Sequence, residues 1–458
     1  MARARPVVVL DDDPTGTQTV RDVPVLTLAG LDELERVLRS GARAVFIPTN
    51  SRSLSPAAAA DLALQLGERI AAAAEATRRR VSVISRSDST LRGHFPVEVD
   101  ALAGALGRPD ARILLMPYFG EGGRVTVNDI HYLVRDGVPV PVADTEFARD
   151  RSFGYEESNL REWVAARVGE PARPITSIPL AVIRTGGPDA VASALRDLAP
   201  GAVCVANALV DRDVDVVAAG VLMAERAGVP VIARTAASFV RARAGQSRHA
   251  LLGPDEVRVG RGPGLVVVGS HVPGTTRQLA RLVAAPPSAL EVVELEATLA
   301  ADPRRARRAI GTAARRVETA IHEGRTAVLA TSRVLLPGTR GEEPGAALER
   351  SARVSSALVG VVAALSDRPA WIVAKGGITS SDVATSALGV SVARVLGQAV
   401  AGVPVWRCGT GSRWPGLTLV VFPGNVGTDD DLRKVVAMLE RAARRPRPTR
   451  IRDRVARR

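Results

Sequence analysis

Residues 6–16 of the chain read PVVVLDDDPTG. The apolar run predicts a buried β-strand, because β-branched residues without polar alternation are typical of strands covered on both faces. The adjacent carboxylates that follow, Asp11 to Asp13, repel one another and add no stability on their own. A positive or hydroxyl-rich group is therefore expected to meet them. The stretch predicts both a parallel sheet and a polar site at its edge.

The alternation of strand and helix repeats along the chain. In the first part, strands are expected at 44–50, 81–88, 111–119, 201–210 and 229–235, and helices at 31–41, 57–80 and 214–227. Segment 241–264 loses this periodicity and gains Gly, Pro and charge, which is typical of a domain boundary. A second series follows, with strands expected at 264–270, 290–296, 326–332, 369–377 and 417–425, and helices at 275–285, 304–324, 351–365 and after 377.

These patterns predict an α/β fold made of two α/β domains. Each domain is expected to have a largely parallel sheet flanked by helices, with the active site in the cleft between the domains. We place the N-terminal domain at 1–245, the C-terminal domain at 260–445 and a basic tail at 446–458. A length of 458 residues suits two or three cores of ordinary size.

The composition limits the possible compartments and metals. The 46% hydrophobic and 24% charged fractions are typical of a globular protein. No apolar stretch approaches the roughly 20 residues that span a bilayer. Two cysteines form no disulfide framework, and the five histidines lack metal-ligand spacing. We therefore expect a cytoplasmic protein without a membrane partner or a structural zinc ion.

The net charge of +13 resembles that of a nucleic-acid-binding protein. The chain is rich in Arg and Ala and has only two lysines, Lys375 and Lys434, which indicates a coding bias. The aromatic fraction is 3%, too small for base-stacking platforms. We interpret the basic tail as a solvated end and expect no nucleic-acid partner.

Polar residues follow the strands of the first domain. Ligands of open α/β sheets bind beyond the carboxyl ends of the strands. The four segments there are rich in Asp, Arg, Ser, Thr and Asn: 11–16, 50–53, 85–95 and 119–129. Carboxylates accept hydrogen bonds from hydroxyls, and arginines bind carboxylate or phosphate. The set suits a small polyhydroxylated acid; the alternative is that each group only caps a helix or closes a turn.

Glycines follow the strands of the second domain. Lys375-Gly376-Gly377 comes before Thr379 at a helix start, Gly269-Ser270 repeats the arrangement, and Gly424, Asn425 and Gly427 follow the last strand. Glycines let a backbone approach phosphate closely. None of these loops is a Walker A or GxGxxG motif, and a Gly-Gly turn with a capping serine is the alternative.

At these loops the chain resembles the four-carbon acid sugar kinase family, long known as a domain of unknown function, from about Val7 to Leu439. The matching motifs are Asp12-Asp13-Pro14-Thr15-Gly16, Asp88-Ser89-Thr90-Leu91-Arg92-Gly93, Ser270, Gly376-Gly377-Ile378-Thr379 and Gly424-Asn425-Val426-Gly427. Ile378 stands where the family usually has Glu.

The resemblance implies ATP-dependent phosphorylation of an acid such as erythronate, threonate or a 3-oxo relative. It implies that the N-terminal domain holds the sugar acid and the C-terminal domain the nucleotide. We assign Arg86 and Arg92 to the carboxylate of the acid, and Asp12, Asp13 and Asp88 to its hydroxyls. Asp13 or Asp88 is the candidate base.

The remaining assignments combine this resemblance with the polar and glycine residues at the strand ends. Ser89 and Arg124 are expected to bind the sugar acid. The residues expected to bind ATP, with Mg²⁺ bridging its phosphates, are Ser270, Lys375, Gly376, Gly377, Ile378, Thr379, Gly424, Asn425 and Gly427. A homodimer is expected. The competing hypothesis is a non-catalytic sensor of a sugar acid or nucleotide; the sequence does not identify the acid or the phosphorylated hydroxyl.

Overall fold

The computed structural model describes residues 5–13, 16–169, 172–332 and 346–445. The chain divides into two compact units. The N-terminal unit comprises Met1–Ala250, Gly389–Pro404 and Gly409–Ser412. The C-terminal unit comprises Leu251–Leu388, Val405–Cys408 and Arg413–Arg458. Each unit is described by itself below.

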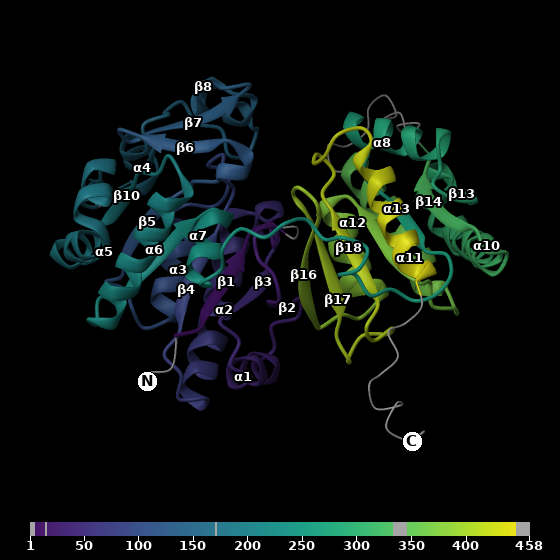
Figure 1. The fold of residues 1–458 in the computed structure, drawn as a ribbon, viewed down its shortest axis with the longest axis horizontal. Coiled ribbons are helices and arrows are strands. Elements are labelled where there is room, and N and C mark those ends of the chain that lie inside the picture. The colour runs from purple at the N-terminus through teal and green to yellow at the C-terminus, as the bar shows by residue number, and fades with distance from the viewer. Residues whose placement is uncertain (1–4, 14–15, 170–171, 333–345, 446–458) are drawn as a thin grey trace, which may run out of the picture. The chain divides into compact units, whose positions relative to one another are not determined.

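The N-terminal unit is built on one large sheet (Figure 1). Its strands are β1 (Val7–Asp11), β2 (Pro24–Leu26), β3 (Ala44–Pro48), β4 (Ser82–Arg86), β5 (Arg112–Met116), β9 (Ile175–Ile178), β10 (Val203–Ala206), β11 (Val231–Thr235) and β16 (Val392–Val400). Their order is β16-β2-β3-β1-β4-β11-β5-β10-β9. Within this order only the pairing of β16 with β2 is antiparallel.

Helices cover both faces of this sheet. They are α1 (Leu31–Arg39), α2 (Pro56–Ala76), α3 (Val97–Ala105), α4 (Leu160–Val168), α5 (Leu180–Asp197), α6 (Asp211–Arg226) and α7 (Ala237–Arg243), with short 3₁₀ turns η1 (Ser51–Ser53), η2 (Gly120–Gly122), η3 (Val142–Asp144) and η4 (Glu146–Arg149). Alternate strand residues such as Val8 and Leu10 pack in one core with α1 to α4. Their neighbours Val7 and Val9 are equally buried, on the side of α5 to α7.

Local sequence explains the main helix of this layer. The Ser55 hydroxyl accepts from the Ala58 amide at 3.3 Å and Pro56 occupies the first turn, so α2 begins there. A Cβ at Gly67 would lie 2.5 Å from the Cβ of Ala105, so glycine permits the close packing of α2 on α3.

The N-terminal unit also carries a small antiparallel sheet, β6 (Arg124–Val127), β7 (Ile130–Arg135) and β8 (Val138–Pro141). The three strands lie together at one end of the unit (Figure 1). Asn128 and Asp129 join β6 to β7 with positive φ, and Asp136-Gly137 joins β7 to β8 in the same way. Such residues favour tight hairpin turns.

The strands of the C-terminal unit lie in the order β13-β14-β12-β15-β18-β17. Its strands are β12 (Leu265–Val268), β13 (Leu290–Leu295), β14 (Thr326–Thr331), β15 (Ile372–Lys375), β17 (Val403–Cys408) and β18 (Thr418–Phe422). Its helices are α8 (Pro273–Ala284), α9 (Ala297–Ala301), α10 (Pro303–His322), α11 (Ala346–Ala364), α12 (Gly377–Asp382), the π-helical turn η5 (Val383–Ala387) and α13 (Asp431–Arg444). Within this order only β17 pairs antiparallel, with β18.

The α/β class predicted from the sequence is confirmed, with a largely parallel sheet in each unit. Two parts differ from the expectation. Residues 119–129 were expected to form a loop, but β6 begins at Arg124 within them. The segment between the last two expected strands holds β16 and β17 as well as a helix. The predicted domain limits and the cleft between domains stay predictions.

Candidate active site

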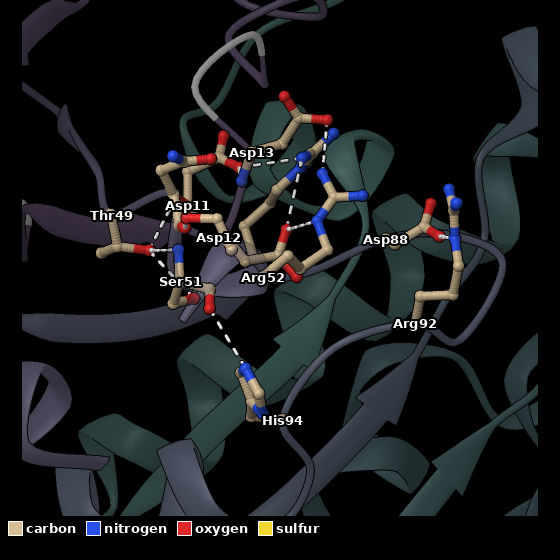
Figure 2. A network of polar contacts seen from close by, with 12 residues as sticks. Asp11, Asp12, Asp13, Thr49, Ser51, Arg52, Asp88, Arg92 and His94 are labelled. Carbon is tan, nitrogen blue, oxygen red and sulfur yellow. Dashed lines mark hydrogen bonds and ion pairs between the residues drawn. The ribbon is translucent and has the colours of Figure 1, made fainter. Parts of the chain in front are cut away.

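Strands β1, β3 and β4 end at one edge of the N-terminal sheet, because they are parallel and in register. Asp11 at the end of β1 lies opposite Pro48 of β3 and Arg86 of β4. The loops that follow these strands therefore share this edge. We call the charged residues gathered there the Asp–Arg edge: Asp11, Asp12, Asp13, Arg52, Arg86, Asp88, Arg92 and Arg234. Figure 2 shows many of their contacts.

Asp11 fixes the loop after β1. Its Oδ1 accepts from Arg86 Nη1 at 2.8 Å and from the Asp13 amide at 3.0 Å. A Cβ at Gly16 would overlap the Asp11 carboxylate, so the glycine of the motif lets the chain turn over it. Burial raises the pKa of Asp11 to about 7, and Arg86 limits that rise. The strand ends at Asp11, as the sequence predicts.

Asp12 is a buried carboxylate surrounded by cations. Arg52 Nε lies 3.3 Å from Oδ1, Arg86 Nη1 lies 3.9 Å from Oδ1, and Arg234 Nη2 lies 3.9 Å from Oδ2. Neither oxygen has a hydrogen-bond partner among the described residues. Burial raises the pKa of Asp12 to about 6, against the pull of the guanidinium groups. Both oxygens are buried acceptors whose charge is balanced only by the nearby guanidinium groups.

Arg52 joins two of the carboxylates. It lies in η1, directly after β3, and its Nη2 is 2.5 Å from Asp13 Oδ2 while its Nε faces Asp12. Figure 2 shows its side chain reaching toward Asp12 and Asp13. About one fifth of the Arg52 side chain is exposed. The sequence indicated the polar segment 50–53 but not Arg52 itself.

Asp88 stands on the loop after β4. Its Oδ2 accepts from Arg92 Nε at 2.6 Å and from the Thr90 hydroxyl. Burial acts to raise the pKa of Asp88, but Arg52, Arg92 and these hydrogen bonds outweigh it and hold the pKa below its usual value. The carboxylate is therefore ionised near neutral pH. No hydrogen bond to its Oδ1 occurs within the described part of the chain.

Arg86 is a buried member of the Asp–Arg edge. It is 7% exposed, and its Nη1 and Nη2 donate to Asp11 and, at 3.5 Å, to Gln18 Oε1. Its expected contact with a substrate carboxylate stays a prediction. In the structure its donors fix Asp11 and the loop after β1.

Arg234 on β11 is the charged residue that the sequence reasoning missed. It is buried, and its Nη1 donates to Glu98 at 2.9 Å and to Ser85 Oγ at 2.7 Å. Gly93 has φ +130°, and a Cβ there would lie 2.6 Å from Arg234 Nη2 and 3.0 Å from Asp12 Oδ2. The signal was a lone arginine in an otherwise apolar strand, which needs a buried partner.

The small sheet supports the Asp88 loop. Ser89 is buried, and its carbonyl accepts from His131 Nε2 of β7 at 2.8 Å. Because Nε2 donates, Nδ1 must accept from the Thr126 hydroxyl, 2.9 Å away. Burial lowers the pKa of His131 to about 4, so the ring is neutral at physiological pH. Arg124 stands at the start of β6 and interacts electrostatically with Asp88.

Three strand ends of the C-terminal unit meet so closely that glycine is required. A Cβ at Gly376 would lie 2.9 Å from Thr379 Oγ1 and 3.3 Å from Ser270 Cβ; at Gly424 it would lie 2.7 Å from Ser270 Oγ. A Cβ at Gly269 would overlap Thr379. We call these five residues the glycine cradle. Gly376 has φ +127°, which side chains rarely adopt.

Lys375 is held by the loop that follows β18. It is fully buried at the end of β15, and its Nζ donates to the carbonyls of Pro423 at 2.6 Å and Val426 at 3.3 Å. The ammonium also lies 3.8 Å from the centroid of the Phe422 ring. Burial lowers the pKa of Lys375 to about 7. Its expected contact with phosphate stays a prediction; the structure shows it holding the loop after β18.

The other residues expected at the nucleotide surround this cradle. Gly377 and Ile378 open α12, and Ile378 is 58% exposed. Asn425 is exposed on the loop after β18, and Gly427 has φ +91° beside Asp431. The structure thus gathers the predicted residues into one group in each unit.

Parts of the sequence predictions lie outside the described residues. These are Pro14 and Thr15 of the first motif and the tail 446–458. Among the residues that are described, no three His, Cys, Asp or Glu side chains are grouped to hold a metal ion.

Comparison with known proteins decides the family. A family model described as the sugar-binding N-terminal domain matches residues 7–243, more than half of the chain. A second, described as the nucleotide-binding C-terminal domain, matches residues 265–432. The chain belongs to the four-carbon acid sugar kinase family. The resemblance predicted from the motifs is confirmed.

One relative in this kinase family is a D-erythronate kinase from Heliobacterium modesticaldum, 30% identical over 287 residues. The match covers 60% of this chain and 60% of that kinase, so the chain spans less than two thirds of the relative's length.

Solved structures share the fold. A protein from Salmonella typhimurium LT2 that carries the provisional name of a tRNA synthase has a TM-score of 0.69 at 15% identity, over 94% of this chain and 98% of that one. A Haemophilus influenzae protein, assigned to a domain of unknown function, has a TM-score of 0.64 at 17% identity, over 94% and 100%. At these identities the likeness concerns the fold alone. None of the described helices has the length and apolar character needed to cross a membrane.

Proposed function

We propose that this protein is an ATP-dependent kinase that phosphorylates a hydroxyl of a four-carbon sugar acid, a tetronate or 3-oxo-tetronate. One observation carries the proposal. The unit matched by the sugar-binding family gathers Asp12, Asp13 and Asp88 with arginines at its strand ends, and the same chain continues into a nucleotide-binding domain. The kinship with a D-erythronate kinase supports the choice of acid.

The Asp–Arg edge has the chemistry to bind a polyhydroxylated acid. Asp12 has two carboxylate oxygens that accept no hydrogen bond within the described chain, although three guanidinium groups lie 3.3–3.9 Å from them. Its neighbour Asp13 is partly exposed and held by Arg52. Hydroxyl groups donate well to ionised carboxylates, and such charge-assisted hydrogen bonds are roughly twice as strong as neutral ones. Asp12 and Asp13 therefore orient the hydroxyls of the acid.

Asp88 is the better candidate for the base. Its lowered pKa keeps it ionised, and Thr90 and Arg92 fix its Oδ2, so that Oδ1 can receive a proton. Asp13, by contrast, is tied to Arg52 at 2.5 Å. In the proposed step the acceptor hydroxyl gives its proton to Asp88 as its oxygen bonds to the γ-phosphorus. The bond from that phosphorus to the β–γ bridging oxygen breaks, and ADP leaves.

The glycine cradle fits the phosphates of a nucleotide. A Cβ on Gly269, Gly376 or Gly424 would occupy the space between the loops, so backbone and hydroxyl groups line it. Ser270 and Thr379 are the hydroxyl-bearing residues there. Mg²⁺ usually keeps several waters and binds largely through substrate phosphates, which suits this donor set. When bound, the ion neutralises charge that develops on the phosphates.

The test is a panel of four-carbon acids with ATP, read as ADP release. The panel holds D-erythronate, L- and D-threonate and the 3-oxo acids. We expect ADP release only in the presence of the right acid, and its loss in Asp88→Asn. The matched control is Asp110→Asn, an exposed carboxylate of the same unit. An acid that binds in calorimetry without ADP release would identify a sensor instead and refute the kinase proposal.

The cellular location that we propose follows from the same function. We place the enzyme in the cytoplasm, where ATP is available and where the two cysteines, Cys204 and Cys408, both buried and free, stay reduced. A homodimer stays a prediction from the family.

A further inference from the structure

Two arginines of the N-terminal unit share one aromatic ring beside Asp88. The guanidinium carbon of Arg92 lies 5.1 Å from the centroid of the Phe147 ring, and that of Arg124 lies 5.8 Å from it. Arg92 comes from the loop after β4 and Arg124 from β6, while Phe147 lies in η4. Three separate segments thus gather two cations over one apolar surface.

Described carboxylates balance the charge of Arg92 but form no ion pair with Arg124. Arg92 donates to Asp88 Oδ2 at 2.6 Å and lies 3.7 Å from Asp150. Arg124 forms no ion pair with any described carboxylate; its Nη1 donates only to the Gly122 carbonyl, at 2.6 Å. Its Nε is buried and unpartnered.

Neighbouring groups do not supply the missing charge. Glu146, the acidic residue of η4, is paired with Arg135 at 2.5 Å. Burial lowers the pKa of Arg124; Asp88 and Glu146 act to raise that pKa, while Arg135 and Arg92 act to lower it. A guanidinium held half-buried among other cations calls for an anion that the described chain does not provide.

The small sheet holds Arg124 in a fixed place. Its amide and carbonyl both bond to Phe119, at 2.9 and 3.0 Å. A Cβ at Gly122 would overlap Arg124 Nη1, so the glycine makes room for the folded side chain. The neutral His131 ring ties the same sheet to the Ser89 carbonyl of the Asp88 loop at 2.8 Å. The distance between Arg124 and Asp88 is therefore set by the fold.

We propose that Arg124, together with Arg92, binds the carboxylate of the substrate and makes this enzyme selective for sugar acids over neutral polyols. The inference rests on the proposed function and names the group that reads the acid. A carboxylate between the two guanidiniums would accept two pairs of hydrogen bonds, and the carbon chain of a four-carbon acid then leads its hydroxyls toward Asp88. Because the donors of Arg86 already bond to Asp11 and Gln18, we assign the carboxylate to Arg92 and Arg124 in preference to Arg86.

The test compares each acid with the polyol that lacks its charge. D-erythronate is paired with erythritol and D-threonate with threitol, for the wild type, Arg124→Ala and Arg124→Lys. We expect the acid-to-polyol ratio of kcat/KM to fall on the order of 10²-fold in R124A and by less in R124K, which keeps the charge but not the planar fork. Activity toward the polyol should fall much less than activity toward the acid. The matched control is Arg161→Ala, an exposed arginine of the same unit.

Calorimetry without ATP separates this inference from the kinase proposal. If the kinase proposal fails, tetronate still binds more tightly than the polyol, and R124A still removes that preference. If R124A lowers activity or affinity for acid and polyol equally, Arg124 is structural and the inference is wrong. Should R124A not fold, R124K decides: an unchanged acid-to-polyol ratio refutes the inference, and a reduced ratio supports it.

Discussion

The Asp–Arg edge and the glycine cradle occupy the same kind of position in their sheets but are built from different kinds of residue. Both follow the carboxyl ends of parallel strands. The first is filled with buried charged side chains, and the second is lined by glycines that leave the backbone open, with its nearest cation, Lys375, bonded to carbonyls. A polyhydroxylated acid needs directed side-chain acceptors, whereas phosphate is met by backbone groups. Substitutions should therefore have different effects on activity, stability and binding in the two regions.

The largest effect is expected at the Asp–Arg edge. Asp88→Asn removes the proton acceptor while keeping the shape, so kcat should fall on the order of 10²–10⁴-fold. Binding of ATP to the C-terminal unit should not change. Steady-state ADP release and ATP calorimetry measure the two quantities. A variant that retains more than a third of the wild-type kcat would show that Asp88 is not the base.

Charge burial should also make the Asp–Arg edge costly for stability. The pKa of Asp12 is raised from 3.8 to about 6 by burial, so the native state binds more protons than the unfolded chain between these pH values. The free energy of unfolding contributed by Asp12 therefore falls as pH rises, by at most about 3 kcal/mol. Asp12→Asn should be increasingly more stable than the wild type from pH 4 to pH 7 in urea unfolding.

Asp431, which lies beside Gly427, should show the opposite dependence of stability on pH. Burial acts to raise its pKa, but hydrogen bonds from Lys434 and the Thr428 amide outweigh it and lower the pKa. Its stabilisation is present at neutral pH and is lost as pH falls through the lowered pKa. Asp431→Asn should therefore lower stability at pH 7 and have little effect in acid. If the stabilities of the Asp12 and Asp431 variants, relative to the wild type, changed with pH in the same way, the expected difference between the two regions would be wrong.

At the cradle, a single methyl group should be enough to impair binding. Gly376→Ala places a Cβ at φ +127° and 2.9 Å from Thr379 Oγ1. The strain and the overlap should displace the loop proposed to hold phosphate, so ATP affinity should fall roughly tenfold or more, without an effect on acid binding. Gly324→Ala is the control, because its φ is +78° but its Cβ would meet open space. Equal ATP affinity in both variants would contradict the assignment.

The smallest effect is expected from the basic tail. Removing residues 446–458 should leave acid binding, ATP binding and turnover unchanged, because both regions are complete within the preceding chain. ADP release and gel-shift assays with RNA and DNA would measure this. A loss of turnover, or a nucleic-acid affinity that disappears when the tail is removed, would show that the tail takes part in function.

The sequence predicts the two regions unequally well. The strands of the parallel sheets were recognisable because their apolar runs are continuous, and the loops after them followed. Arg234 escaped because its partners, Glu98 and Asp12, are far apart in sequence and no local pattern joins them. The small sheet escaped because segment 119–129 was interpreted as a strand-end loop, although Asp136-Gly137 is a strong hairpin signal.

Lys375 shows most clearly what could not be predicted from the sequence. A rare lysine beside a Gly-Gly turn favours phosphate binding when only the sequence is considered. In the structure the same residue is buried with its ammonium on the carbonyls of Pro423 and Val426. The direction of a side chain at a strand end depends on the loop that packs over it, and that loop lies almost fifty residues later, at Pro423–Val426.

The most direct test of the account is ³¹P NMR of the purified chain with ATP, Mg²⁺ and D-erythronate or the best acid of the panel. We predict ADP and a phosphate ester of the sugar acid in equal amounts, with neither formed by Asp88→Asn. Free inorganic phosphate without an ester, or no consumption of ATP while the acid binds, would contradict the claim that the two regions serve phosphoryl transfer to a sugar acid.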